Sequence, residues 1–329
     1  MSKNLHLFGI GAAIVDIQLQ IQEHEFTPLE LTKGTMNLVD EHRQIELLRR
    51  FSHYEPNWCS GGSAANTIIG FAQLGGRAGF GSMLGKDAMG EFYANEFKEL
   101  GIELHAPVLD NHSTGTSLIV ITPDSERTMN TALASNAFYN KEHVAEEGIK
   151  RSEWIYFEGF KFTEEAGVAA IEEALFYAKK HDTRVAMSFS DSFVVNVFGS
   201  HLRKSILQSD LIFCNQAEAE AFTGIDNAEE AFEALRKEAR HVTLTLGAQG
   251  SRLYWDGAAY SIPPASANPI DTTGAGDMYA AGVLYGLTHG HSPEAAGRLG
   301  AVAASRVISQ LGARLAQSDI DAAKREVVS

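Results

Sequence analysis

Hydrophobic and polar positions near the start of the chain follow two different patterns. Residues 5–9 are apolar apart from His6, a pattern typical of a strand buried on both faces of a sheet. Residues 15–21 alternate between apolar and polar with a period of two, which predicts a half-exposed strand. The chain therefore begins with strands of two kinds of sheet, and Asp16 lies at the junction between them.

From residue 154 onward, short apolar runs alternate with helix-like stretches. The pattern predicts strands at 154–157, 184–189 and 211–214, a helix over 163–180 and an Ala-rich helix over 291–310. Such alternation indicates parallel strands joined by crossover helices. Ligands of such sheets bind at the carboxyl ends of the strands, so the polar residues that follow each strand are site candidates.

The region between these parts returns to short strand-like pieces. Residues 115–122 and 126–130 read as two strands joined by a turn at 123–125. Together with residues 15–21 they are expected to form a small separate sheet. The expected division is a large α/β domain of residues 1–14, 22–103 and 131–329 and a small β unit of residues 15–21 and 104–130.

Composition and charge narrow the class of protein. The 329 residues, 44% of them hydrophobic, suffice for one large α/β domain with a small appendage. A net charge of −15 argues against nucleic acid or an anionic membrane as partner. A phosphate-binding enzyme of this charge would rely on backbone amides, a few Arg or Lys side chains and a divalent ion. A monomer and a homodimer are both compatible with this composition.

The cysteines and the N-terminal run bear on the compartment. The two cysteines, Cys59 and Cys214, are far apart and form no CxxC pair, so a disulfide scaffold and a zinc site are both disfavoured. The twelve histidines are scattered without a metal-binding spacing. Asp16 cuts short the apolar run at residues 5–10, which favours a buried strand over a signal sequence and predicts a cytoplasmic protein.

The segment 271–277, Asp-Thr-Thr-Gly-Ala-Gly-Asp, leads directly into the helix-like residues 278–283. Two glycines bring bare N–H groups close to a ligand, and the N-terminus of a helix attracts an anion such as phosphate. Asp277 would repel that phosphate unless it accepts a proton, and with an ordinary pKa of about 3.9 it is ionised at pH 7. The alternative is that Asp271 and Asp277 only cap an ordinary helix.

This segment resembles the second signature of the ribokinase-like (phosphofructokinase-B type) carbohydrate kinases, D-T-x-G-A-G-D. The resemblance implies a three-layer α/β fold with a central, mostly parallel sheet, in which the small β-sheet is a lid over the acceptor. It also implies that Asp277 is the catalytic base and that Gly274, Ala275 and Gly276 form the anion hole for the transferred phosphoryl group.

A second set of residues resembles the part of the family that binds the acceptor. Residues 60–75, with the Gly-rich residues 79–90, resemble the first signature, G-G-x-x-x-N followed by G-x-D-x-x-G. By this resemblance Gly61, Gly62 and Asn66 contact hydroxyls of the acceptor, and Asp16 grips hydroxyls of a sugar. The alternatives are a tight strand-to-helix connection for the glycines and a surface turn for Asp16.

Two motifs resemble the nucleotide side of the family. Asn215 and Glu218 match N-x-x-E, whose Glu acts on Mg²⁺, usually through water, although a Glu in a first helical turn also complements the helix dipole. Thr245, Gly247 and Gly250 match the nucleotide loop T-x-G-x-x-G, which could equally be a turn between two strands. The implied cofactors are ATP and Mg²⁺.

The acceptor is the least determined feature. Arg127 in a candidate lid strand and Phe160 after a strand resemble the adenosine-kinase-like branch, in which they serve the phosphates and the base; a solvated lid Arg is the alternative. Ala12 stands where that branch often has Asn. The expected function is therefore phosphorylation of an adenosine-like nucleoside, with a simple carbohydrate as the alternative acceptor.

Two rivals from other classes fit less well. A non-catalytic sugar-binding protein on the same fold would lack the base, whereas Asp277 is present. An NAD-dependent dehydrogenase needs a third glycine after Gly9 and Gly11, and position 14 is Ile14.

Overall fold

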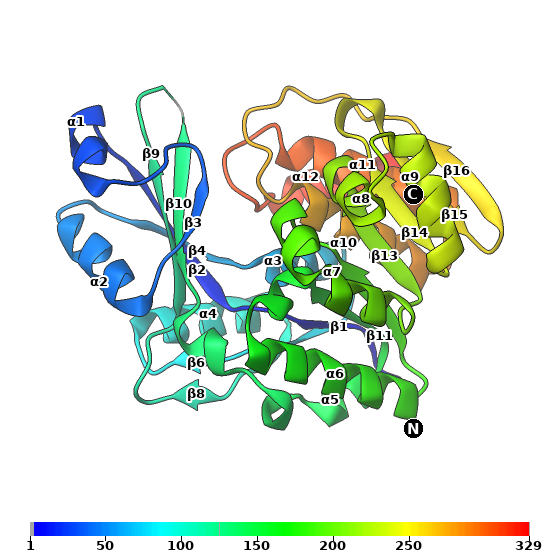
Figure 1. The fold of residues 1–329 in the computed structure, drawn as a ribbon, viewed down its shortest axis with the longest axis horizontal. Helices are drawn as coiled ribbons and strands as arrows, with labels where there is room; N and C mark the ends of the chain where they lie inside the picture. Colours follow the sequence, from blue (N-terminus) through cyan, green and yellow to red (C-terminus); the bar gives the residue numbers. More distant parts are fainter. Residues whose placement is uncertain (1–2, 125, 329) are drawn as a thin grey trace.

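The computed structural model describes residues 3–124 and 126–328, and it contains a large sheet and a small sheet (Figure 1). Ser125, in the turn expected at 123–125, lies outside the described residues. The nine strands of the large sheet run in the spatial order β16-β15-β14-β13-β12-β11-β1-β5-β7. Their bounds are β1 Leu5–Ile10, β5 Ala78–Gly81, β7 Glu103–His105, β11 Ser152–Glu158, β12 Arg184–Ser188, β13 Leu211–Asn215, β14 Val242–Thr245, β15 Ser251–Trp255 and β16 Ala258–Ile262.

The pairing of these strands confirms the expected mostly parallel sheet. All neighbours from β7 to β14 pair in parallel, and only β15 and β16 pair antiparallel. The strands predicted at 5–9, 154–157, 184–189 and 211–214 correspond to β1, β11, β12 and β13. A short separate ribbon pairs β6 (Leu84–Gly85) with β8 (Val108–Leu109).

Helices cover both faces of the large sheet and give three layers. Along β11, Trp154 and Tyr156 belong to one hydrophobic core, whereas Ile155 and Phe157 belong to the other. This alternation follows from the pleat of the strand. The α-helices in and beside these layers are α3 Ser63–Gln73, α4 Ala88–Glu99, α5 Glu146–Lys150, α6 Glu165–Lys180, α7 Ser192–Ile206, α8 Gln216–Thr223, α9 Ala228–Glu238, α10 Ala275–Thr288, α11 Pro293–Val307 and α12 Gln317–Val328.

The helix predictions hold within a few residues. The helix expected over 291–310 is α11, and the one expected over 163–180 is α6, which begins at Glu165 after a 3-10 turn. The 3-10 turns are η1 Thr27–Leu29, η2 Ala134–Phe138, η3 Lys141–His143, η4 Gly159–Thr163 and η5 Gly247–Gln249.

The small sheet has the order β3-β10-β9-β2-β4. Its strands are β2 Ile14–Gln20, β3 Met36–Leu38, β4 Asn57–Gly61, β9 Gly115–Ile121 and β10 Arg127–Ala132. The helices α1 (Glu23–Phe26) and α2 (Glu41–Arg50) lie on the side of this sheet that points away from the large domain (Figure 1).

The expected domain boundaries need correction at both ends. Residues 36–38 and 57–61, assigned to the large domain, are strands of the small sheet, whereas Glu103–His105, assigned to the small unit, pairs with β5 of the large sheet. The cause is physical: β3 has three residues with exposed Met36 and Leu38, and β4 reads Asn-Trp-Cys-Ser-Gly. Neither has the apolar alternation that marks a strand in sequence.

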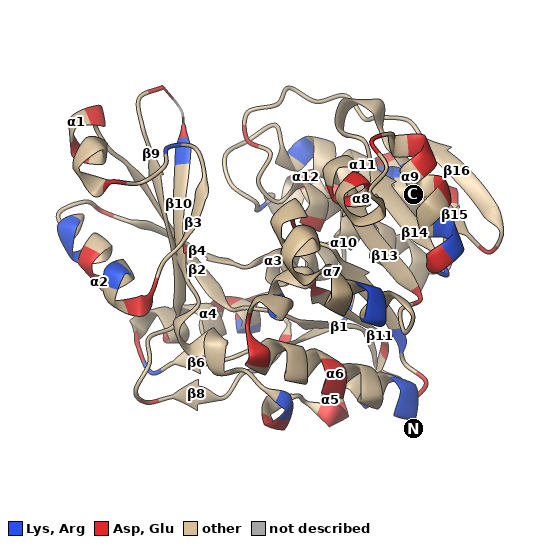
Figure 2. Ribbon diagram, viewed as in Figure 1, with Lys and Arg blue, Asp and Glu red and all other residues tan. Residues whose placement is uncertain are grey.

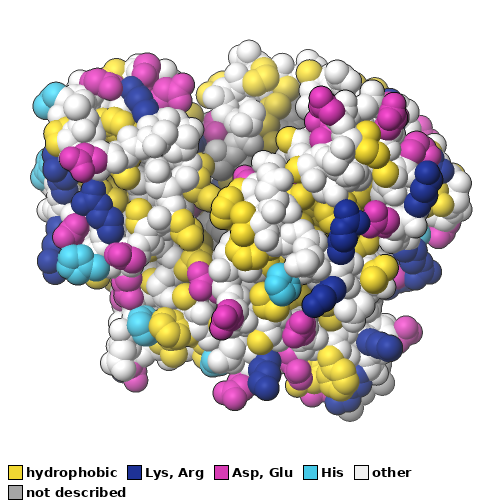
Figure 3. Space-filling view, in the orientation of Figure 1, with side chains coloured by type: hydrophobic (Ala, Val, Ile, Leu, Met, Phe, Trp, Pro, Cys, Tyr) yellow, Lys and Arg dark blue, Asp and Glu magenta, His cyan; other side chains and the backbone are white. Residues whose placement is uncertain are grey.

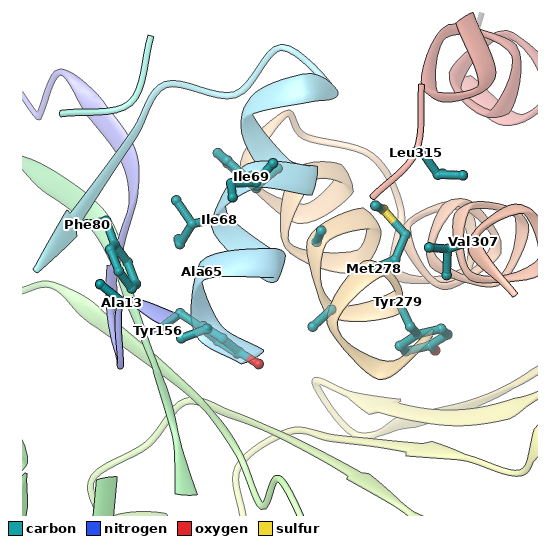
Figure 4. Close-up of a cluster of buried hydrophobic side chains, with 14 of the residues drawn as sticks. Ala13, Ala65, Ile68, Ile69, Phe80, Tyr156, Met278, Tyr279, Val307 and Leu315 are labelled. Carbon is teal, nitrogen blue, oxygen red and sulfur yellow. The ribbon is translucent and has the colours of Figure 1, made fainter. Parts of the chain in front are cut away.

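Helices α3 and α10 pack closely under the carboxyl end of the large sheet (Figure 4). Ile68 and Ile69 of α3 point into the same core as Met278 and Tyr279 of α10. The two helices approach closely at Gly70, where an added Cβ would lie 3.0 Å from the end of the Met278 side chain. The first turns of both helices are thereby brought together.

Charged residues of both signs lie on the outer elements of the small sheet and of the large domain (Figure 2). Acidic and basic residues are interspersed over the outer elements, and no large basic patch is visible among the described residues drawn in Figure 2. Within residues 3–124 and 126–328, no helix is both long and apolar enough to span a membrane. A hollow separates the small sheet from the large domain, and apolar side chains lie on both of its walls (Figure 3).

Candidate active site

Asp277 lies in the first turn of α10, opposite the first turn of α3. The hydroxyl of Ser63 donates a hydrogen bond of 2.6 Å to its Oδ1, and the Asn66 amide donates one of 3.1 Å to its Oδ2. The two sequence signatures, which are some 200 residues apart, therefore meet at one carboxylate. Asn66 was expected to bind the acceptor; the structure adds a contact to the candidate base.

Burial raises the pKa of Asp277 from 3.8 to about 7. The hydrogen bonds from Ser63 and Asn66 lower it, and the nearby Glu158 carboxylate raises it further. The expectation of an aspartate with an ordinary pKa is thus wrong, because desolvation at the junction of α3 and α10 disfavours the ionised form. A carboxylate whose pKa lies near neutrality is well suited to proton transfer at physiological pH.

The turn before α10 presents backbone N–H groups. Gly274 has a φ of +75°, and a Cβ placed there would lie 2.5 Å from the Cβ of Ala313. The Ala275 N–H donates to the Thr272 carbonyl oxygen at 3.2 Å. Among the described residues, no acceptor bonds the N–H groups of Gly276 and Asp277. The N–H group of Gly274 also has no acceptor among the described residues, so the free donors of the predicted anion hole are those of Gly274, Gly276 and Asp277.

Asp271 and Arg127 join the small sheet to this turn. The Arg127 guanidinium, 12% exposed, forms an ion pair with Asp271, which is 5% exposed. The other Asp271 oxygen accepts from the Thr273 backbone N–H at 3.0 Å and from its hydroxyl at 2.7 Å. Nε and Nη2 of Arg127 are buried and have no hydrogen-bond partner within the described part of the chain. Arg127, expected to clamp phosphate, is thus held next to the anion-hole turn by a carboxylate.

Asp16 lies against the turn that carries the first signature. A Cβ on Gly61 would lie 2.5 Å from Asp16 Oδ2, and Gly62 has a φ of +100° with its Cβ position 2.2 Å from the Ala12 carbonyl oxygen. Both glycines are therefore required by close approach and backbone conformation. Burial raises the pKa of Asp16 to about 7; Arg127 opposes this rise and Asp277 adds to it. Asp16 and Asp277 therefore lie within electrostatic reach of each other.

The residues of the expected nucleotide side follow β13 and β14. Asn215 caps α8, and its backbone N–H and side-chain amide donate to Glu218 at 3.0 and 2.7 Å. Glu218 is 4% exposed, and burial raises its pKa to about 7, with further rises from Asp191 and Asp277. Glu218 was considered either to act on Mg²⁺ or to complement the helix dipole. Both roles are compatible with the structure, because the capping box with Asn215 leaves the Glu218 carboxylate beside the site.

The loop after β14 is a turn between two strands, with special glycines. Thr245 ends β14, and its hydroxyl donates to the Cys214 carbonyl oxygen at 3.5 Å. Gly247 and Gly250 have φ values of +56° and +87°. A Cβ on Gly250 would lie 2.1 Å from the Ile262 carbonyl oxygen, so only glycine fits there.

The carboxylates near the site fit a divalent ion that also binds phosphate oxygens. No group of three or more metal-ligating side chains occurs in the described residues, so the protein alone does not form a complete metal site. Glu218, however, is buried within electrostatic range of the Asp191 and Asp277 carboxylates. A hydrated Mg²⁺ held mainly by nucleotide phosphates suits this arrangement.

Phe160 is the predicted residue least connected to the others. It is partly exposed in η4 and packs against the second hydrophobic core. No bond or ring contact joins Phe160 to the Asp277 cluster among the described residues. Sequence reasoning also assigned no role to Ser63 or Glu158; Ser63 follows the Gly-Gly pair directly, and that position was the only signal for it.

The fold and site together define an α/β kinase with a ribokinase-like fold. Residues 56–320 match the model of the pfkB family carbohydrate kinases. The chain belongs to this family, and it is a phosphotransferase with a hydroxyl group as acceptor.

The proteins similar to this chain are named for different acceptors. A 5-dehydro-2-deoxygluconokinase of Bacillus subtilis is 27% identical over 84% of this chain and 87% of its own. Two solved structures are similar: a probable sugar kinase of Rhizobium etli, with TM-score 0.89, 30% identity and coverage of 99% of both chains, and an adenosine kinase of Sinorhizobium meliloti, with TM-score 0.88, 33% identity and coverage of 98% and 99%. The simple-carbohydrate alternative is therefore supported at least as well as the adenosine expectation.

Proposed function

We propose that this protein transfers the γ-phosphoryl group of Mg-ATP to a hydroxyl of a simple carbohydrate. The observation that carries the proposal is the position of Asp277, which accepts hydrogen bonds from Ser63 and Asn66 beside the free N–H groups of Gly276 and Asp277. A proton acceptor and an anion site are thus adjacent. Phosphoryl transfer needs little more than such positioning and charge stabilisation.

Each group has a role in this transfer. Asp16 and Asn66 bind hydroxyls of the acceptor, and Asp277 takes the proton of the attacking hydroxyl as it reaches the phosphorus. The free N–H groups of α10 stabilise negative charge on the transferred group. Glu218 and Asn215 would orient Mg²⁺ through water, and this ion would neutralise charge on the phosphates when bound. Thr245, Gly247 and Gly250 line the nucleotide side.

A nucleoside is the second candidate acceptor, and apolar surface favours it. Met36 and Leu38 on β3 are 45% and 60% exposed, and Phe193 and Val197 on α7 are 56% and 57% exposed. These two elements border the hollow between the small sheet and the large domain (Figures 1 and 3). A base would bury such surface, whereas a simple carbohydrate has no need of it. The similarity to an adenosine kinase at 33% identity supports the same candidate.

A substrate panel with one matched pair of variants tests both candidates. Initial rates with Mg-ATP are measured for ribose, hexoses, 5-dehydro-2-deoxygluconate and adenosine. Phe193→Ser removes an apolar side chain beside the hollow, and Phe176→Ser removes one that is 58% exposed on α6. For a carbohydrate kinase we expect a sugar to have the highest kcat/KM and both variants to stay within about twofold. The nucleoside would be assigned instead if adenosine is preferred and if Phe193→Ser alone lowers kcat/KM by about tenfold or more, which is the size of one lost apolar contact.

A further inference from the structure

The chain passes between the two sheets near the carboxyl end of β1. Residues 11–13 connect β1 of the large sheet to β2 of the small one, and Gly62 connects β4 of the small sheet to α3. Residues 133–136 return from β10 to the large domain. Asp16 lies just beyond the first connection, and Ser63 and Asn66 just beyond the second. The relative position of these connections therefore fixes where the acceptor-side groups stand.

Glu158 bonds two of these connections at once. It ends β11, the neighbour of β1, and is 2% exposed. Its Oε1 accepts from the Ala12 N–H at 3.0 Å, and its Oε2 accepts from the Ala64 N–H at 2.6 Å. Gly11 leaves room for this carboxylate, because a Cβ there would lie 3.0 Å from Oε1 and 2.6 Å from the Ala64 Cβ.

Asn136 and Ser82 complete the same junction with buried polar bonds. The Asn136 side chain accepts from the Ala13 N–H at 2.9 Å and donates to the Ala13 carbonyl oxygen at 2.8 Å. The Ser82 hydroxyl, just beyond β5 on the other side of β1, lies 2.8 Å from the Gly11 carbonyl oxygen and 2.9 Å from Asn136 Oδ1. Residues 11–13 are therefore bonded by side chains from three separate segments.

A buried carboxylate in this place is costly unless it is bonded. Burial raises the pKa of Glu158, and the two backbone N–H bonds oppose that rise. Lys161 lies near, but its ammonium group is directed at the Asn136 carbonyl oxygen at 3.5 Å and at the Tyr139 ring. Both Glu158 oxygens bond backbone, and the residue is almost wholly buried. A direct contact to the acceptor is therefore not its role.

We infer that Glu158 is a positioning residue for the acceptor side of the site, acting by holding the β1–β2 and β4–α3 connections in one register. The consequence for transfer rests on the proposed kinase function, since it concerns where Asp16, Ser63 and Asn66 stand relative to Asp277. The junction itself is a property of the fold and can be measured without an acceptor.

The test uses Glu158→Gln, with Glu165→Gln as the matched control on the exposed first turn of α6. The glutamine oxygen can still accept from one of the two backbone N–H groups, Ala12 or Ala64. Its NH₂ group faces the other N–H, which loses its acceptor, so one of the two connections is released. We expect the KM for the acceptor to rise by about tenfold, as for the loss of one charge-assisted hydrogen bond, while the KM for Mg-ATP stays within about twofold. Equal KM changes for both substrates, or none, in a folded variant would overturn the inference.

Hydrogen exchange of the unliganded protein gives a second test that needs no substrate. The N–H groups of Ala12, Ala13 and Ala64 should exchange at least about a hundredfold more slowly than free amides, because each is buried and bonded. In Glu158→Gln, Ala12 or Ala64 should lose this protection while Glu165→Gln leaves it intact. Exchange of Ala12 and Ala64 at the rate of free amides in the parent contradicts the inference. If the parent phosphorylates no panel substrate, the proposed function fails, whereas the exchange result still decides the role of Glu158.

Discussion

Replacement of Asp277 by asparagine separates its role as a base from its role in the fold. Ser63 can still bond the asparagine oxygen, and Asn66 can turn its amide so that its own oxygen faces the new NH₂ group. The local packing is thus retained, while the proton acceptor and one negative charge are lost. Mg-ATP binding should persist or tighten, because the removed charge lies beside the phosphate site.

The raised pKa sets the size of the effect and its pH dependence. A positioned base contributes about 10²–10⁴-fold, and this full loss in kcat is expected at pH 8, where Asp277 with its pKa of about 7 is ionised. At pH 6 only about a tenth of the parent is ionised, so the parent-to-variant ratio should be about tenfold smaller than at pH 8.

Asp277→Asn should raise the stability of the folded protein at pH 8 although it lowers kcat. The rise of the Asp277 pKa from 3.8 to about 7 corresponds to on the order of 4 kcal/mol. The folded state favours the protonated form, so stability is lost as the pH rises from about 4 through 7. Asp277→Asn should therefore unfold at a higher temperature than the parent at pH 8 and at a similar one near pH 4.

Steady-state kinetics at pH 6 and pH 8, together with thermal unfolding at pH 4 and pH 8, of the parent and of Asp277→Asn measure both effects. Asp321→Asn on α12 is the matched control, because Asp321 is exposed and its bond from Gln317 can persist. Near-parental kcat at pH 8 in a folded variant would refute the base assignment. Loss of turnover together with loss of Mg-ATP binding would instead make Asp277 a structural residue.

Three further predictions follow from single residues. Glu218→Gln should raise the Mg²⁺ concentration for half-maximal rate by about tenfold or more while Glu220→Gln does not, as a Mg²⁺ titration of the rate would show. Gly274→Ala should lower the unfolding free energy by about 1–3 kcal/mol because of its φ of +75°, whereas Gly276→Ala, with no atom within 4 Å of its Cβ position, should keep the parental melting temperature but lose turnover. Burial together with Arg77 and His289 lowers the pKa of His6 to about 4, so its contribution to stability should be complete above pH 6.5 and lost as the pH falls towards 4, and His6→Gln should flatten that dependence in melts from pH 4 to 8.

The central strands of the large sheet could be predicted from sequence because they are buried on both faces. Runs such as Trp154–Phe157 are apolar at every position, and each is followed by polar residues and then a helix. The small sheet could be predicted only in part. The seven-residue strands β2 and β9 contain enough apolar residues to be recognised in the sequence. Strand β3, by contrast, is held by pairing with β10 over a separation of about ninety residues. Pairing of this kind leaves no local signal.

The candidate site shows the same division between local and long-range information. The turn at 271–277 and the glycines at 61 and 62 could be found because their backbone chemistry is written in consecutive residues. The Arg127–Asp271 ion pair could not, because it joins β10 of the small sheet to a turn 144 residues later. Arg127 was interpreted as a phosphate clamp from its charge and from the resemblance to the adenosine-kinase-like branch, and its buried partner became visible only in three dimensions.

The pKa values are the property that sequence reasoning reached least well. A net charge of −15 shows that carboxylates are abundant but not which of them are buried. Asp16, Glu218 and Asp277 each have a pKa raised to about 7, with burial as the largest cause and Asp277 adding to the rise in the other two. Burial depends on how α3, α8, α10 and β2 converge, and mutual repulsion depends on their distances. Under the proposed function, three carboxylates with pKa values of about 7 carry less negative charge at neutral pH than three ordinary ones, which would favour the binding of an anionic nucleotide.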